Sequence, residues 1–433
     1  MTNKRFANNA GWLIAQQIYS GILSFVISAI AANYLGLGDF GLIGYSASYI
    51  ALFTGITRLG LDSVIVGELV SKQDDAGNIL CSAMVMRIIV SVLSMAALAG
   101  LMAVIEPGNS VLMVITVLQS VSVVLSIYEV FFYWFHARLE SKYPAIGAMA
   151  ASIVVCVWRI VLLALGASVE WFAASAMIQA FVTLVVVAII FKQRAAVRFS
   201  YSLGMMKQLF KKSYHFMISG LAILIYLQTD KVMIGSMMGK TYVGYYAAAA
   251  AVSQLWLFIL CSLNISSQPI ILKKHGSDPT GFIRSFQLLL FAVASMGLVT
   301  GVFFQVFGKE ITVFIFGDAY IASAEMLSVL IWASIFSGIG FARNIWIIAE
   351  ELNKYVKYFS ALGAVGNIVL NFYLIKSFGI IGAAAATLCT EVFIVLAAPL
   401  LFKRTRCFVP LLLGSFARLP EFLQQRKKDN PDD

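Results

Sequence analysis

The chain has 433 residues, of which 61% are hydrophobic and only 12% are charged. A soluble domain carries about 25% charged residues, so this composition excludes a soluble protein and indicates a polytopic membrane protein. The net charge of +10 would suit a nucleic-acid partner, but the basic residues lie in short loops between apolar runs. That placement is typical of membrane proteins, so no nucleic-acid partner is expected.

A membrane-spanning helix needs roughly 20 apolar residues, and twelve such segments follow one another along the chain. Their pattern is helical or continuously apolar, which disfavours a β-barrel. We therefore predict an all-α polytopic membrane protein with about 12 transmembrane helices. The expected spans are residues 11–33, 41–61, 79–104, 110–134, 144–166, 170–191, 213–237, 241–265, 283–307, 323–347, 355–375 and 379–402.

The distribution of basic residues predicts the orientation of these spans. The N-terminus, the even-numbered loops and the C-terminal segment hold 26 of the 31 Lys and Arg residues, and the opposite side holds three. Because basic residues are retained in the cytoplasm, both termini are predicted to be cytoplasmic.

The chain is predicted to consist of two six-helix lobes around a central cavity. The longest internal loop is basic and lies near the midpoint, and the sequences GLGDFG (residues 36–41) and GKTYVG (residues 239–244) suggest an internal repeat. Alternatively, these glycines only reflect tight turns. The predicted parts are a first lobe at 1–191, a basic linker at 192–212, a second lobe at 213–402 and a cytoplasmic tail at 403–433.

Cofactor and enzyme signatures are not found in the sequence. The five cysteines show no pairing pattern, and the three histidines lack metal-ligand spacing. Residues 235–241 (GSMMGKT) resemble a phosphate-binding loop but have three residues between the glycines where that motif needs four. No metal, organic cofactor or enzyme activity is therefore expected.

Polar residues inside apolar spans are the candidate site residues, because an ionisable group in hydrocarbon is costly unless it is paired or faces water. Asp230 and Lys231 lie in the seventh expected span and Glu391 lies near the centre of the twelfth, so these side chains cannot easily reach an interface. We expect them to line a water-filled cavity; buried ion pairs are the alternative. The full set of cavity candidates is Arg159, Asp230, Lys231, Glu391, Gln16 and Gln17.

Other charged residues have simpler expected roles. Arg87 and Glu129 lie in the cytoplasmic halves of the third and fourth expected spans, so we expect their side chains to extend to the membrane surface. Arg58 and Asp62 are four residues apart at a helix end, a spacing that favours an ordinary ion pair.

Several segments resemble the polysaccharide transport family, which belongs to the superfamily of multidrug/oligosaccharidyl-lipid/polysaccharide exporters. These segments are YLGLGDFG at residues 34–41, ARLESKYPA at 137–145, TDKVMIG at 229–235, GYYAAA at 244–249 and IFGDAYIASAEMLSVL at 315–330. The resemblance implies two six-helix lobes facing a cavity that opens alternately to each side. It also implies that Asp230 stands at the acidic position of the family's D-x-x-x-I-G pattern.

The resemblance further implies a flippase that moves an undecaprenyl-diphosphate-linked oligosaccharide from the cytoplasmic to the outer leaflet of the bacterial inner membrane, for O-antigen, lipopolysaccharide or exopolysaccharide biosynthesis. It also implies that transport uses an ion gradient, with H⁺ or Na⁺ as the coupling ion. The expected partners are this substrate and the bilayer, with a polysaccharide polymerase and assembly proteins as candidate protein partners. Two alternatives remain: a multidrug or cation antiporter of the same superfamily, and a membrane enzyme of polysaccharide assembly. The antiporter would favour an acidic cavity, and the enzyme would favour a long extracytoplasmic loop.

The predicted orientation can be tested with reporter fusions. A fusion after Arg198 should report the cytoplasm and one after Lys240 the opposite side, because the charge bias assigns these positions to different compartments. Alkaline phosphatase and fluorescent-protein activities measure the two outcomes, and the same compartment for both positions would contradict the topology.

Overall fold

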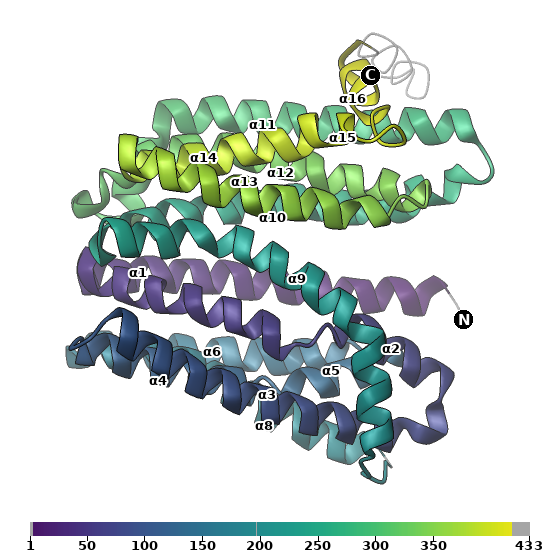
Figure 1. Cartoon of the computed structure of the whole chain (residues 1–433), viewed down its shortest axis with the longest axis horizontal. Coiled ribbons are helices and arrows are strands. Elements are labelled where there is room, and N and C mark those ends of the chain that lie inside the picture. The colour runs from purple at the N-terminus through teal and green to yellow at the C-terminus, as the bar shows by residue number, and fades with distance from the viewer. Residues whose placement is uncertain (1–2, 196, 418–433) are drawn as a thin grey trace, which may run out of the picture. The chain divides into compact units, whose positions relative to one another are not determined.

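A computed structural model describes residues 3–195 and 197–417, and within these ranges every regular element is helical (Figure 1). Contacts divide the chain into two compact units, the first extending to Ala247 and the second beginning at Ala248. The first unit contains α1 (Asn3–Thr57), α2 (Asp62–Ser71), η1 (Gln73–Asp75), α3 (Ala76–Ile105), α4 (Ser110–Leu125), α5 (Tyr128–Ala137), α6 (Lys142–Leu165), α7 (Val169–Ala173), α8 (Ser175–Arg194), α9 (Leu203–Met237) and the start of α10 (Lys240–His275).

The second unit is also helical. It contains the remainder of α10, α11 (Pro279–Phe316), η2 (Asp318–Tyr320), α12 (Ser323–Ala349), α13 (Lys354–Phe378), α14 (Ile380–Val392), η3 (Phe393–Ala397), α15 (Ala398–Leu400) and α16 (Phe408–Ala417). The element η3 is a π-helical turn that joins α14 to α15.

The prediction of an all-helical membrane protein is confirmed. In the described ranges, eleven helical segments are long and apolar enough to cross a membrane. The first of these, Gly11–Thr57, holds the first expected span and most of the second, 41–61. As one straight helix its 47 residues would extend roughly 70 Å, about twice the thickness of a bilayer core. The backbone breaks at Gly36, with φ 70° and ψ 179°, and α1 folds back on itself there (Figure 1). A side chain would be strained in that conformation, which explains the glycine.

The basic segment predicted as a linker is shorter than residues 192–212, because α8 continues to Arg194 and α9 already begins at Leu203. The first turns of α9 bury Met205, Leu209 and Ser213, spaced four residues apart, so this part of the helix packs by one face. Lys212 forms an ion pair with Glu68 of α2, and the hydrogen bond from Lys212 holds the pKa of Glu68 below its ordinary value.

The contact boundary and the predicted lobe boundary differ. Helix α9 packs against α1 and α3, which assigns it to the first compact unit by contacts. The charge pattern and the repeat place the division before α9. The two-lobe division at residues 192–212 therefore stays a prediction.

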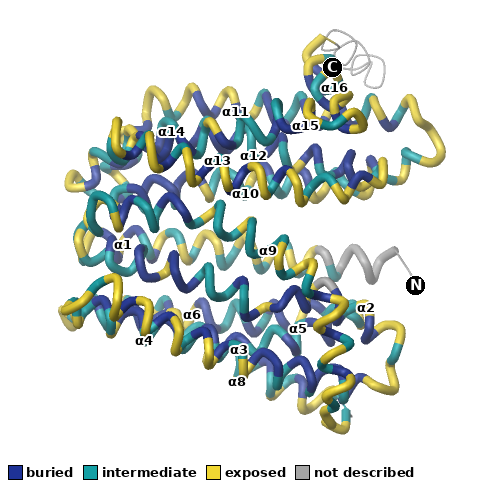
Figure 2. The backbone as a smooth tube through the Cα atoms, in the orientation of Figure 1, coloured by how far each residue is buried: buried dark blue, intermediate teal, exposed yellow. Residues whose placement is uncertain are grey.

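The core of the first unit is formed where α2, α3, α5 and α9 meet. Leu61, Ile65, Ile79, Phe135 and Leu209 are fully buried in this cluster. By contrast, many large apolar side chains of the helices are exposed. Figure 2 shows how exposed and buried positions alternate along the helices. Such apolar exposure is expected of helices whose outer faces contact lipid.

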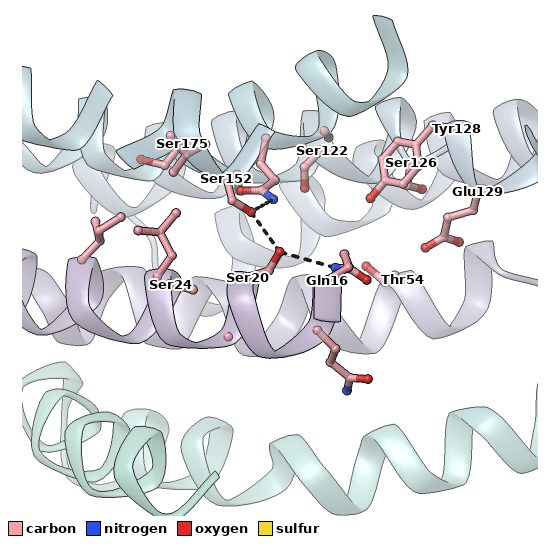
Figure 3. Close-up of a pocket in the computed structure, with 18 of the residues that line it drawn as sticks. Gln16, Ser20, Ser24, Thr54, Ser122, Ser126, Tyr128, Glu129, Ser152 and Ser175 are labelled. Atoms are coloured by element: carbon pink, nitrogen blue, oxygen red, sulfur yellow. Dashed lines mark hydrogen bonds between the residues drawn. The ribbon is translucent and has the colours of Figure 1, made fainter. Parts of the chain in front are cut away.

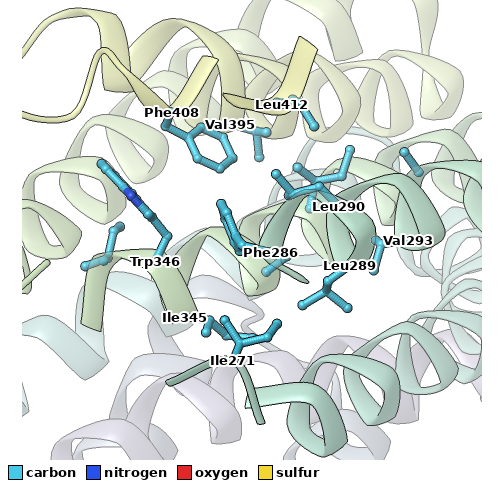
Figure 4. Packing of buried hydrophobic residues seen from close by; sticks show 14 of the residues in the cluster. Ile271, Phe286, Leu289, Leu290, Val293, Ile345, Trp346, Val395, Phe408 and Leu412 are labelled. Carbon is cyan, nitrogen blue, oxygen red and sulfur yellow. The ribbon is translucent and has the colours of Figure 1, made fainter. Parts of the chain in front are cut away.

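The second unit has its own core around α11 and α12. Phe286 and Leu290 of α11, Trp346 of α12, Val395 of η3 and Phe408 of α16 pack together (Figure 4). Gln287 of α11 also donates a hydrogen bond to the carbonyl oxygen of Leu411, at 3.2 Å. These contacts fix α16, the first part of the predicted tail 403–433, against α11; residues 418–433 lie outside the described residues.

The two Gly-x4-Gly turns pack directly against each other. A Cβ atom on Gly41 would lie 1.9 Å from the carbonyl oxygen of Lys240, and one on Gly244 would lie 2.4 Å from that of Leu37. Both distances are far below van der Waals contact. These two glycines are therefore required by a close approach of two backbones, which is a stronger constraint than a tight turn alone.

We expect Gly244→Ala to destabilise the protein by about 1–3 kcal/mol, because the new methyl group would force these two backbones apart. The matched control is Gly38→Ala, since no atom lies within 4 Å of a Cβ there. The apparent Tm of the purified protein in detergent measures both effects. An equal Tm for the Gly244→Ala variant and the wild type would contradict the close packing.

Candidate functional site

The candidate site is a cavity of about 580 Å³ within the first unit. It is enclosed by residues of α1, α4, α5, α6 and α8 and lies among membrane-spanning helices. Its lining is dominated by hydroxyl and amide side chains, and Figure 3 shows serines of α1 facing serines of the helices opposite. The polar and aromatic lining consists of Gln16, Gln17, Ser20, Ser24, Thr54, Arg58, Ser122, Ser126, Tyr128, Glu129, Ser152, Arg159, Ser175 and Gln179.

A chain of hydrogen bonds crosses the cavity from α1 to α8. Gln16 donates to the hydroxyl of Ser20 at 3.4 Å, Ser152 donates to Ser20 at 3.3 Å, and Gln179 donates to Ser152 at 3.4 Å (Figure 3). These distances are at the long end for such bonds. Groups held so loosely can exchange partners with the hydroxyl groups of a ligand at little cost.

Arg159 of α6 supplies a positive charge to the cavity. Its Nε donates to the hydroxyl of Ser175 at 3.1 Å, and its Nη1 donates to that of Ser28 at 3.4 Å. Among the described residues no carboxylate forms an ion pair with Arg159, so its charge is not neutralised by the protein there. A guanidinium has five N–H donors, and the remaining ones are available to an anionic ligand.

At the other end of the cavity, Glu129 bridges two arginines. Its Oε1 accepts from Arg58 and its Oε2 accepts from Arg87, each at 2.8 Å. Arg87 is 1% exposed and also donates to Ser126 at 3.1 Å and to Tyr133 at 3.4 Å. The carboxylate of Glu129 raises the pKa of Arg58 above its ordinary value, so Arg58 remains charged.

This network corrects two expectations. Arg87 does not extend to the membrane surface, because Glu129 and two hydroxyl groups satisfy its charge inside the protein. Arg58 forms its ion pair with Glu129, 71 residues away, and the described structure contains no ion pair between Arg58 and Asp62. One feature of the sequence could have indicated this network: charges of both signs lie in neighbouring spans, where they could form ion pairs.

Three of the predicted site residues, Gln16, Gln17 and Arg159, line this cavity, and the other three do not. Asp230 is buried on α9, where the hydroxyl of Tyr246 donates to its Oδ2. The neighbouring Lys231 is partly buried and forms no ion pair with any described residue. Asp230 and Lys231, which are adjacent in sequence and opposite in charge, thus lie on α9 and are not part of the cavity lining.

Glu391, the sixth candidate, belongs to the second unit. It lies on α14 close enough to Arg343 of α12 for their charges to attract each other. Arg343 is 5% exposed, stacks 4.7 Å over the ring of Phe359, and donates to the carbonyl oxygen of Ile394 at 2.6 Å. Ile394 is in the π-helical turn, where the regular helical hydrogen bonds are interrupted.

The fold of the chain is similar to that of several polytopic membrane transporters. It superposes on the lipid II flippase MurJ in an inward closed conformation with a TM-score of 0.71 and 16% identity, covering 95% of this chain and 92% of that one. It also resembles a MOP superfamily transporter from Pyrococcus furiosus, with a TM-score of 0.63, 13% identity and coverage of 93% and 96%. A mutant of the Vibrio cholerae MATE transporter VcmN gives a TM-score of 0.62 and 14% identity, with coverage of 95% and 100%.

Residues 6–274 match the family model of the polysaccharide biosynthesis proteins, and the chain belongs to this family. A relative in Haloferax volcanii, described as a probable low-salt glycan biosynthesis flippase Agl15, is 26% identical over 183 residues. That match covers 42% of this chain and 39% of the relative's length. The chain is therefore a polysaccharide biosynthesis family protein with the fold of these membrane transporters, in agreement with the family resemblance noted in the sequence.

We expect Glu129→Gln to lower the free energy of unfolding by about 3 kcal/mol, because it leaves the buried Arg87 without a counter-charge. Thermal unfolding of the purified protein measures this. The matched control is Glu310→Gln, an exposed residue outside any described ion pair, which should change stability by less than about 0.5 kcal/mol. Equal shifts for both variants would show that the network contributes nothing specific.

Proposed function

We propose that this protein translocates an undecaprenyl-diphosphate-linked oligosaccharide, an O-antigen or exopolysaccharide repeat unit, from the cytoplasmic to the outer leaflet of the bacterial inner membrane. The observation that carries this proposal is Arg159, which has no carboxylate partner among the described residues and lies in a cavity lined mainly by hydroxyl and amide groups. Membership of the polysaccharide biosynthesis family supports it, as do the flippase descriptions of MurJ and of the Haloferax relative.

The chemistry of the cavity suits the two polar parts of such a substrate. A diphosphate is a strong anion that needs charged donors when it leaves water, and Arg159 offers them in a fixed planar array. Sugar hydroxyl groups donate and accept hydrogen bonds, as the lining serines and glutamines also do. At about 580 Å³, the cavity would enclose the diphosphate and part of the glycan, while the polyprenyl chain stays in lipid.

A cation antiporter is less well supported by the same cavity. Such a transporter needs an acidic group that can bind the cation. Of the residues described as the cavity lining, Glu129 is the one carboxylate, and both of its oxygens are already bound to arginines. The net charge of the lining is positive, which favours an anionic ligand.

The transport cycle we propose is alternating access coupled to an ion gradient of H⁺ or Na⁺, without ATP. Ion binding can shift the protein between two states only if its affinity differs between them. Asp230, hydrogen-bonded to Tyr246, and Glu391, near Arg343, are the carboxylates we propose for this role. Both termini are proposed to be cytoplasmic, and a polysaccharide polymerase is a proposed partner.

Deletion of the gene tests the function directly. We expect surface glycan to disappear and lipid-linked repeat units to accumulate in the cytoplasmic leaflet, measured by their inaccessibility to an impermeant oxidant or lectin. Accumulation of unpolymerised units in the outer leaflet would place the protein after translocation and overturn the proposal.

Complementation with Arg159→Gln then tests the site. Loss of a charge-assisted contact to the diphosphate should reduce glycan export about tenfold or more at equal protein level. The control is Arg404→Gln, an exposed arginine outside the cavity lining, which should complement fully. Full activity of the Arg159→Gln variant would exclude Arg159 from substrate binding.

A further inference from the structure

A second polar pocket, of about 470 Å³, lies at one end of the first unit. It is formed where α5 and α8 both end, and it shares no lining residue with the cavity that contains Arg159. Its lining is almost entirely polar or aromatic, although no part of the transport reasoning above uses it. The lining residues are Trp134, Arg138, Glu140, Gln193 and Arg194.

The two arginines of this pocket are held by aromatic rings. The guanidinium of Arg138 lies 4.1 Å from the ring centre of Trp134, and that of Arg194 lies 4.2 Å from the ring centre of Tyr143. Stacking fixes the plane of a guanidinium while leaving its N–H groups at the edge free for hydrogen bonds. Both arginines are exposed, and neither forms an ion pair within the described part of the chain.

The pocket also contains one acidic residue and one unused donor. Glu140 lines it without an ion pair to either arginine among the described residues, so the two arginines leave a net positive charge. Trp134 is 2% exposed, and its Nε1 has no acceptor in the described structure. A buried donor without an acceptor is unfavourable, and this one leaves the pocket with one donor that the described residues do not satisfy.

The position of the pocket along its helices fits a membrane interface. Helices α5 and α8 belong to membrane-spanning segments, and the pocket lies where both of them end. Trp and Tyr side chains are enriched at this level, where lipid phosphates also lie. Basic pockets between transmembrane helices are suited to binding anionic lipid head groups.

We propose that this pocket binds a phosphate group, supplied by the head group of an anionic phospholipid. Arg138 and Arg194 would each donate to the phosphate oxygens, and Gln193 would add a neutral donor. The glycerol and acyl chains would extend along the exposed apolar sides of the helices. The proposal does not depend on the transported substrate, because it concerns different residues from those of the transport cavity.

Lipid retention by the full-length protein tests the proposal. The protein would be purified from nanodiscs of phosphatidylglycerol and phosphatidylcholine, and the retained lipid measured by native mass spectrometry. We expect selective retention of phosphatidylglycerol by the wild type. The double variant Arg138→Gln and Arg194→Gln should reduce that retention about tenfold or more, since two charged contacts are lost.

The matched control is the double variant Lys354→Gln and Lys357→Gln, which removes two other cations that stack on tyrosines, at 5.3 and 5.1 Å. It should retain phosphatidylglycerol like the wild type. Size-exclusion profiles and Tm values show whether each variant is folded, and the single variant Arg194→Gln gives an intermediate test if the double variant unfolds.

A titration with inorganic phosphate separates the two sources of the group. Displacement of phosphatidylglycerol only by phosphate far above millimolar concentration supports the lipid as ligand. Binding of millimolar phosphate that is lost in the Arg138/Arg194 variant, with no lipid retained, supports the phosphate site but assigns it to a soluble anion. Equal retention of both lipids, or wild-type retention by that variant, would overturn the proposal.

Discussion

The cost of a polar group in hydrocarbon governs this structure at every level. Backbone N–H and C=O groups must pair within the chain, which explains why the described elements are helices. The same cost acts on side chains. The buried charge of Arg87 is matched by Glu129, that of Arg343 by a freed carbonyl group, and the cavity gives Arg159 a polar environment. A charge without such a partner marks a place where a ligand can bind.

The spans were predictable from sequence because hydrophobicity over a fixed length is a local property. Each of the twelve expected segments overlaps a described helix or a pair of consecutive helices, and the first two are joined in α1 at Gly36. The N-terminal turns of α9 were not predicted to be helical. They mix basic and apolar residues, and this composition led us to predict a loop there. Only its packing, through Met205 and Leu209, shows that it is helical.

The site was predictable in part. Gln16, Gln17 and Arg159 were identified because polar groups in an apolar span stand out in any sequence. The bridge through Glu129 was not, because its arginines are 71 and 42 residues away and pairing depends on the fold. The two glycine turns could likewise be predicted only in part. Their spacing is visible in the sequence, but the contact of Gly41 with Lys240 is not. Partners distant in sequence are set by tertiary structure.

The π-helical turn at Phe393–Ala397 fixes the rotational register of the helix that contains it. Such a turn accommodates one residue more than an α-helical turn, and one residue corresponds to about 100° of rotation. Returning this segment to α-helical geometry would therefore turn the helix on one side of it by about that angle relative to the other side. Arg343, which binds the carbonyl group of Ile394, holds the segment in its present register. The hydrogen bond from Arg343 thereby stabilises one arrangement of the core-facing and lipid-facing side chains beyond the turn.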